Sequence, residues 1–126
     1  MFEISVETNF FASHQLVLAD GSMEQPHEHI WEVTATVSSK KLNNMGIVMD
    51  FRDLRKMLEN ITAPFDKNML NNFEYFQKNN TSAELVAKYI FEQLEPLLPE
   101  NVKLSGVSVV EAVNSRAKYS KSINSN

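Results

Sequence analysis

The chain has 126 residues with 12 basic and 16 acidic side chains, a formal net charge of −4, and the length of one domain with a hydrophobic core. It contains no cysteine, which excludes a disulfide framework, a thiolate zinc site and a cysteine nucleophile. The acidic balance disfavours nucleic acid as the main partner, and no apolar run reaches the roughly 18 residues that indicate a membrane-spanning helix.

Two segments alternate between apolar and polar side chains, the pattern of half-buried strands. The first covers residues 2–11, the second covers residues 27–38, and turn-forming residues 19–22 lie between them. Two paired antiparallel strands are the simplest interpretation. One face of the second strand carries His27, His29, Trp31, Val33, Ala35 and Val37.

The next two elements have the three-to-four-residue apolar spacing of amphipathic helices. Asp50 is the expected N-cap of the first, which is predicted to end at Pro64. An Asn-rich connection over residues 65–80 follows. Thr81 and Glu84 then form a T-x-x-E capping box, which predicts the start of the second helix.

Strand character returns near the end of the chain. Pro96 or Pro99 is predicted to end the second helix, and strands are predicted over residues 102–111 and 117–123. The order β-β-α-α-β-β indicates an α+β domain with an antiparallel sheet. We assign residues 1–123 to this single domain and expect the last three residues to form a frayed tail.

The three histidines of the chain form a candidate metal site. His27 and His29 are two residues apart on a strand, so their side chains share a face with Cα atoms about 6.5–7 Å apart. His14 ends the first strand, and a hairpin would bring it to the same point. H-x-H pairs also occur on ordinary surface strands, but this face also carries Trp31 and Val33 and is therefore not simply solvated. Three imidazoles with an open fourth position are typical of catalytic Zn²⁺.

Six segments in order resemble the 6-pyruvoyl-tetrahydropterin synthase and 6-carboxy-tetrahydropterin synthase family. The resemblance implies a tunnelling fold, in which two helices cover one face of the sheet and subunits assemble into a barrel. It further implies a homotrimer or hexamer with active sites between subunits, a Zn²⁺ cofactor and a pterin substrate. We also expect a cytoplasmic location, which the absence of cysteine fits. The segments are FASH (11–14), PHEHIWEV, GIVMDFRDL, FDKNMLN, TSAELVA and VSVVEA.

The resemblance assigns roles to individual residues. His14, His27 and His29 match the zinc ligands of the family. Glu111 matches the carboxylate that anchors the pterin ring, a role that suits a group able to accept two hydrogen bonds. Without the resemblance, Glu111 reads as an ordinary acid at the end of a strand. Asp66 matches the aspartate of the family's Asp-His pair.

The sequence departs from the family at two catalytic positions. Met23 stands where the family has its catalytic cysteine, and Lys67 replaces the histidine after Asp66. Neither replacement is an ordinary base at neutral pH. Glu24 gives the pattern E-x-x-H-x-H, which resembles family variants in which glutamate replaces the cysteine. Those variants cleave the side chain of 7,8-dihydroneopterin triphosphate to 6-hydroxymethyl-7,8-dihydropterin.

We therefore predict a zinc-dependent lyase of this kind, with Glu24 as base and Asp66 and Lys67 in the catalytic machinery. Three alternative functions stay open. The protein could be a 6-pyruvoyl- or 6-carboxy-tetrahydropterin synthase, or a paralogue that binds zinc and pterin without this chemistry. It could also be an enzyme on another substrate, with Lys67 as an altered base or imine-forming amine. For Glu24, the alternative is that it is a solvated loop acid without a catalytic role.

Overall fold

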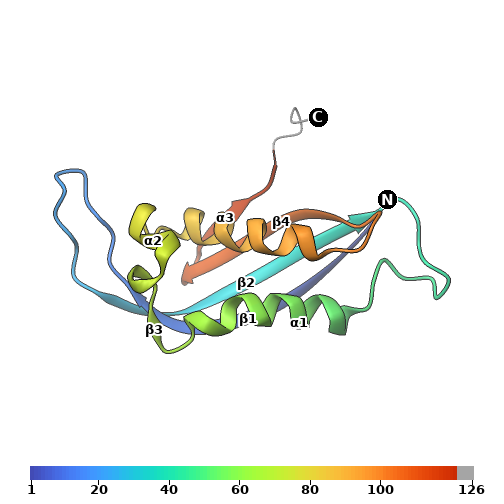
Figure 1. The fold of residues 1–126 in the computed structure, drawn as a ribbon, viewed down its shortest axis with the longest axis horizontal. Helices are drawn as coiled ribbons and strands as arrows, with labels where there is room; N and C mark the ends of the chain where they lie inside the picture. Colours follow the sequence, from blue (N-terminus) through green and yellow to red (C-terminus); the bar gives the residue numbers. More distant parts are fainter. Residues whose placement is uncertain (122–126) are drawn as a thin grey trace.

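A computed structural model describes residues 1–121 and contains five strands and three α-helices (Figure 1). Three single-turn 3₁₀ helices lie between them, over Ala63–Phe65, Leu70–Asn72 and Glu95–Leu97. The strands are β1 (Phe2–His14), β2 (His27–Ser39), β3 (Asn68–Met69), β4 (Lys103–Ala112) and β5 (Ser115–Tyr119). The helices are α1 (Phe51–Thr62), α2 (Glu74–Lys78) and α3 (Ala83–Leu94).

The five strands form one sheet in the order β3-β1-β2-β4-β5. β1 and β2 pair antiparallel along their whole length, from Phe2 opposite Ser39 to His14 opposite His27. The predicted hairpin and the α+β class are thereby confirmed. The sheet has one strand that the prediction lacked: the two-residue β3 pairs parallel to β1 at Ala12 and Ser13, which makes the otherwise antiparallel sheet mixed.

Helices α1 and α3 cover one face of this sheet, and the apolar side chains of both layers meet between them (Figure 1). Period-two alternation turns one face of β1 and β2 toward this core, as predicted, although Phe2 and His27 at the starts of the two strands are exposed. Trp31 belongs to this core, has no exposed surface and stacks on Phe10 at a centroid distance of 5.9 Å. The helices contribute the fully buried residues Leu54, Leu58, Val86, Ala87, Ile90 and Leu94.

The first helix begins where the sequence predicts. The Asp50 side chain accepts a hydrogen bond from the Arg52 backbone N–H at 2.8 Å, as an N-cap should. The Arg52 side chain also donates to this carboxylate, and these bonds hold the pKa of Asp50 at about 2. The helix ends at Thr62, just before the turn that contains Pro64.

The capping box predicted for the second helix is wrong. Ser82, rather than Thr81, caps α3: its hydroxyl accepts from the Leu85 N–H at 3.2 Å. Thr81 is fully buried, and its hydroxyl donates instead to the Gln15 carbonyl at 2.8 Å. This contact with a segment 66 residues away removes Thr81 from the cap.

Two further boundaries differ from the predictions. The connection over residues 65–80 contains β3 and α2, which are too short to give a periodic signal. The last strand, β5, covers Ser115–Tyr119, whereas residues 122–123 of the predicted strand lie outside the described residues. The predicted tail, residues 124–126, also lies outside them.

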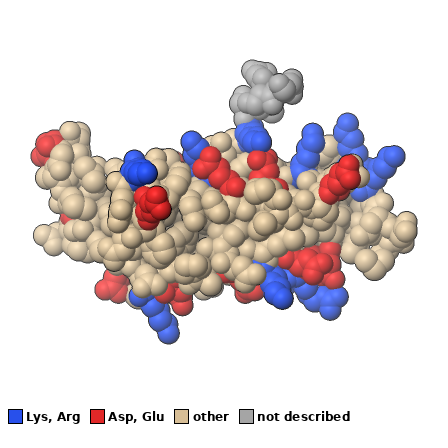
Figure 2. All heavy atoms as spheres, in the orientation of Figure 1, with Lys and Arg blue, Asp and Glu red and all other residues tan. Residues whose placement is uncertain are grey.

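None of the helices in the described part of the chain combines the length and apolarity needed to cross a bilayer. On the face drawn in Figure 2, basic and acidic side chains are interspersed around a largely uncharged centre.

Candidate metal centre

The end of the β1–β2 hairpin brings the three histidines together. His14 lies opposite His27, and His29 lies opposite Ala12, which is two residues before His14 and therefore on the same face. The ring centroids are 6.2 Å apart for His14 and His27, 5.2 Å for His14 and His29, and 5.9 Å for His27 and His29. The three imidazole rings therefore lie near one another, but the group of donor atoms that converge within 4.8 Å contains His14 and His29 and not His27.

Trp31 forms one wall of this cluster. Its ring meets that of His14 edge-on at 4.8 Å and that of His29 at 5.8 Å. Its indole N–H donates to the Ala12 carbonyl at 3.1 Å, which fixes the plane of the ring. The two imidazoles therefore rest on a side chain that cannot easily move.

The orientation of His14 favours a metal. His14 is fully buried, and its Nδ1 lies 2.8 Å from the backbone carbonyl of Thr81. Because a carbonyl only accepts, this contact assigns the proton to Nδ1 and leaves a lone pair on Nε2. Such an outer partner is usual for a metal-binding histidine.

Glu111 completes a group of possible ligands. Its Oε1 lies 2.9 Å from His14 Nε2 and 3.3 Å from His29 Nε2. Among the described residues, neither nitrogen has a hydrogen-bond partner of suitable geometry, although both are buried. Ligand atoms of His14, His29 and Glu111 lie within 4.8 Å of one another. Two buried nitrogens and a carboxylate oxygen that face each other form a donor set that fits Zn²⁺.

The surroundings of His29 favour the neutral imidazole that a metal requires. Burial lowers the pKa of His29, and the nearby His14 and His27 lower it further. Glu111 acts in the opposite direction and only partly offsets these effects. The neutral form of His29 therefore persists to a lower pH than in a free histidine.

Glu24 lies beside the third histidine. Its Oε2 is 3.6 Å from His27 Nε2, while its Oε1 accepts a hydrogen bond from the Leu16 N–H at 3.1 Å. The side chain of Glu24 is 24% exposed and that of His27 49% exposed. Glu24 is thus a held carboxylate at the open side of the cluster, in contrast to a freely solvated loop acid.

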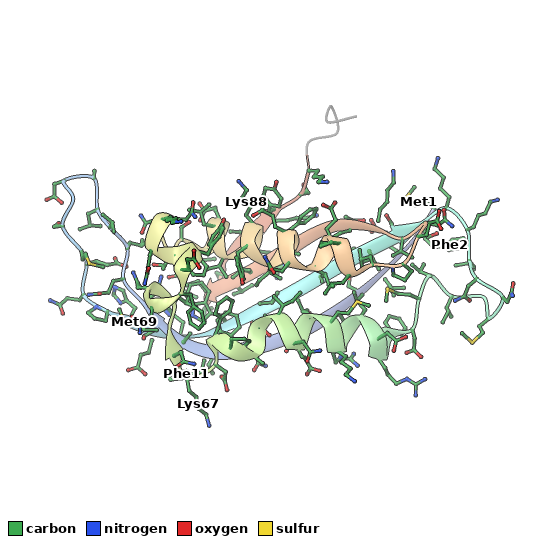
Figure 3. All side chains as sticks on the ribbon, in the orientation of Figure 1. Met1, Phe2, Phe11, Lys67, Met69 and Lys88 are labelled. Carbon is green, nitrogen blue, oxygen red and sulfur yellow. The ribbon has the colours of Figure 1, made fainter. Side chains whose placement is uncertain are left out.

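Asp66 and Lys67 lie outside the cluster. Asp66 Oδ1 accepts from the Phe11 N–H at 2.9 Å, and the Lys67 N–H donates to the Phe11 carbonyl at 2.6 Å. Lys67 has the unusual φ of 63°, and Figure 3 shows its side chain projecting away from the body of the molecule. The fold therefore does not bring this pair to the histidines of the same chain.

The sequence interpretation missed three supporting residues. Thr81 holds His14, and two asparagines, Asn71 and Asn80, hold the segment after it. The abundance of asparagine in residues 65–80 was the available signal. It also missed Glu111 as a metal-site neighbour, which depends on the pairing of β2 with β4.

Comparisons with known proteins agree with this geometry. Residues 3–122 match the sequence profile of 6-pyruvoyl tetrahydropterin synthase. The human 6-pyruvoyl tetrahydrobiopterin synthase is 34% identical, over 93% of this chain and 90% of its own length. A dihydroneopterin monophosphate aldolase of Pyrococcus furiosus is 28% identical, over 86% of this chain and 88% of its own.

Solved structures share the fold. The 6-pyruvoyl tetrahydropterin synthase of Caenorhabditis elegans superposes with a TM-score of 0.85 at 21% identity, over 96% of both chains. That of Plasmodium vivax, solved with alanine in place of a glutamate described as a catalytic residue, gives 0.77 at 20% identity, over 97% of this chain and 98% of its own. The family profile spans nearly the whole chain and the solved structures share its tunnelling fold, so this chain belongs to the 6-pyruvoyl tetrahydropterin synthase family.

Proposed function

We propose that the protein is a zinc-dependent lyase that cleaves the side chain of 7,8-dihydroneopterin triphosphate and releases 6-hydroxymethyl-7,8-dihydropterin. The observation that carries this proposal is the position of Glu24, whose Oε2 lies 3.6 Å from His27 Nε2 at the open side of the histidine cluster. A family member without cysteine needs another base, and this carboxylate is held where a substrate bound at the histidines would meet it.

His14, His27 and His29 are the proposed ligands of Zn²⁺, and Glu111, although its carboxylate lies against His14 and His29, is proposed to serve the substrate instead. The metal would act as a Lewis acid that lowers the pKa of a bound side-chain hydroxyl of the substrate. Glu111 is proposed to accept hydrogen bonds from the ring N–H and amino group of the pterin. Its position at the end of β4, against His14 and His29, supports a pterin ring bound next to the proposed metal ligands.

Glu24 would take the proton of the substrate hydroxyl in a retro-aldol cleavage. The hydroxyl in question is on the second carbon of the side chain. As its O–H bond breaks, this second carbon becomes a carbonyl and its bond to the first carbon, which is attached to the ring, breaks. The electron pair stays on the carbon attached to the ring, where the adjacent C=N group stabilises it. That carbon then takes a proton, which Glu24 can return, so that no other reagent is needed.

Two relatives support this assignment. The Pyrococcus furiosus protein is named as an aldolase that acts on dihydroneopterin monophosphate, so side-chain cleavage occurs among the relatives of this chain. The Plasmodium vivax synthase has a glutamate described as a catalytic residue, so a carboxylate serves in catalysis within this fold.

Asp66 and Lys67 are proposed to act on the active site of a neighbouring subunit. Both are bonded to Phe11 at the outer edge of β1 and lie outside the cluster of their own chain. The side chain of Lys67 projects away from the molecule (Figure 3). A barrel-like trimer or a hexamer with sites between subunits would use them in this way. There Lys67 would pair with Asp66 or with the phosphates of the substrate.

The test is to incubate the zinc-loaded protein with 7,8-dihydroneopterin triphosphate and to identify the products by chromatography. We expect 6-hydroxymethyl-7,8-dihydropterin, and kcat of the Glu24→Gln variant should fall about 10²–10⁴-fold. Glu28→Gln is the matched control, because Glu28 is exposed and lies between the two histidines on the opposite face of β2. A pyruvoyl product, or full activity of Glu24→Gln, would refute the proposal.

A pterin-binding protein without this chemistry is the second candidate. The observation that favours it is the pair of replacements at Met23 and Lys67, which removes both usual proton-transfer groups. Isothermal titration that shows tight binding of a pterin, together with no turnover of any dihydroneopterin phosphate, would select this candidate.

A further inference from the structure

Two asparagine side chains hold the segment that follows His14, residues 15–17, which we call the strap. Asn71 accepts from the Gln15 N–H and donates to the Gln15 carbonyl, both at 2.9 Å. Asn80 makes the same two contacts with Val17, also at 2.9 Å each. A carboxamide that carries a donor and an acceptor side by side copies a peptide group. The two side chains thus replace a neighbouring strand along this edge of the strap.

The opposite edge of the strap holds Glu24. The Leu16 N–H donates to Glu24 Oε1 at 3.1 Å, and the Glu24 N–H donates to the Leu16 carbonyl at 3.0 Å. The Gln15 side chain adds a third bond to the Glu24 carbonyl at 3.1 Å. The position of Glu24 therefore depends on the strap, and the strap is held from its other edge by the asparagines.

The two oxygens of the Glu24 carboxylate therefore have different partners. Oε1 is engaged by the strap, whereas Oε2 faces His27 and has no hydrogen bond within the described part of the chain. One oxygen thus fixes the orientation of the group, and the other is available to take a proton. A displacement of about 1 Å in such a group is enough to lower a rate by about 100-fold.

We infer that Asn71 and Asn80 are positioning residues, which hold the Glu24 carboxylate beside His27 through the strap. The inference rests on the proposed role of Glu24 as the base. The competing explanation is that the two asparagines only satisfy the backbone of a loop. In that case their loss would lower stability, and catalysis by the folded protein would be unchanged.

Asn71 provides the sharper test, because Asn80 precedes Thr81, whose carbonyl holds His14. In the Asn71→Asp variant the acceptor for the Gln15 N–H remains, but the donor to the Gln15 carbonyl becomes a carboxylate that repels it. Asn79→Asp is the matched control: Asn79 donates to the Tyr75 carbonyl at 2.9 Å and is not bonded to the strap.

Three quantities are measured on the zinc-loaded proteins: amide hydrogen exchange at Leu16, zinc affinity by chelator competition, and kcat and KM separately. We expect exchange at Leu16 to be about tenfold faster in Asn71→Asp, and kcat to fall by about tenfold or more, since Glu24 acts in the transition state. KM and zinc affinity should change less than about twofold, because the binding side chains are untouched. Asn79→Asp should match the wild type in all three.

Unchanged exchange at Leu16 in Asn71→Asp, or faster exchange with unchanged kcat, would overturn the inference. A parallel loss of zinc affinity and kcat would also overturn it, because the asparagine would then support the whole site. A wild-type protein without turnover would refute the proposed function instead. The exchange rates of the two variants would then decide alone whether Asn71 holds the strap against Glu24.

Discussion

Two places on β1 differ in where they hold the proposed functional side chains. One is His14 at the end of the strand, and the other is Phe11, three residues earlier, at its outer edge. At His14, pairing of β1 with β2 and of β2 with β4 brings the three histidine rings near one another and sets Glu111 against His14 and His29. At Phe11, the backbone N–H donates to the Asp66 carboxylate and the carbonyl accepts from the Lys67 N–H. These bonds hold both residues at the outer edge of the strand, and the Lys67 side chain points away from it (Figure 3).

This difference separates two functions of the chain. One copy brings its histidines and Glu111 near one another, through the register of its strands and the contact of His14 with the Thr81 carbonyl. It does not carry Asp66 and Lys67 in the same place, since the bonds to Phe11 fix them elsewhere. Under the proposed function the metal ligands would all come from one subunit, whereas the full catalytic set would come from an assembly.

The largest expected effect is the loss of metal from a His14→Ala variant. His14 is buried, and its Nε2 faces possible donor atoms of His29 and Glu111. Because loss of an outer-shell partner alone costs about 10–100-fold in affinity, we expect loss of the ligand to exceed about 100-fold. Metal content after dialysis measures it. An equal loss of metal from an Asp66→Ala variant would contradict the distinction between the histidine cluster and the Asp66–Lys67 pair.

The second prediction concerns the assembly. Asp66→Ala and Glu24→Gln variants should each be nearly inactive under the proposed function. Mixed after gentle dissociation and reassembly, they should regain activity, because some interfaces would combine an intact Glu24 with an intact Asp66 from another subunit. The regained rate of 6-hydroxymethyl product formation is the measurement. Mixtures that stay as inactive as the separate variants would show that Asp66 does not serve a neighbour.

The third prediction compares the neighbours Thr81 and Ser82. Thr81→Val removes the hydroxyl bond to Gln15 and loosens the carbonyl that holds His14, so zinc affinity should fall about tenfold. Ser82→Ala should leave zinc affinity unchanged but lower the free energy of unfolding by about 1 kcal/mol, since it removes only a helix cap. Chelator competition and urea unfolding measure the two effects. Equal changes of zinc affinity in the two variants would contradict the distinct roles of Thr81 and Ser82.

The smallest expected effect is on the pH dependence of stability. In metal-free protein the pKa of His29 lies below its usual value, so the folded state binds fewer protons than the unfolded state. The contribution of His29 is present above about pH 6.5 and is lost as the pH falls through the lowered pKa. Urea midpoints between pH 7.5 and 5 should therefore fall less in His29→Gln than in wild type. Identical curves would contradict this account.

The elements with a long periodic signal were predictable from the sequence. The β1–β2 hairpin follows from alternation, and the cap at Asp50 follows from its side chain and the helical pattern after it. The convergence of His27 and His29 on one face follows from the two-residue repeat. Their meeting with His14 required only that consecutive strands form a hairpin.

Contacts between segments distant in sequence decided the rest. Thr81 and Ser82 are both good caps by residue type, and the bond from Thr81 to Gln15 selects Ser82. No local pattern indicates that Asp66 would bond to Phe11, 55 residues away. The pairing of Asn71 with Gln15 is equally non-local, so the support of Glu24 could not be read from composition.

Trp31 has a consequence for measurement. It is the only tryptophan of the chain, and its ring meets the rings of His14 and His29 edge-on. The protein therefore carries a built-in fluorophore against the histidine cluster. Its emission should respond when a cation or a pterin enters, so binding at this site can be followed in solution without attaching a label.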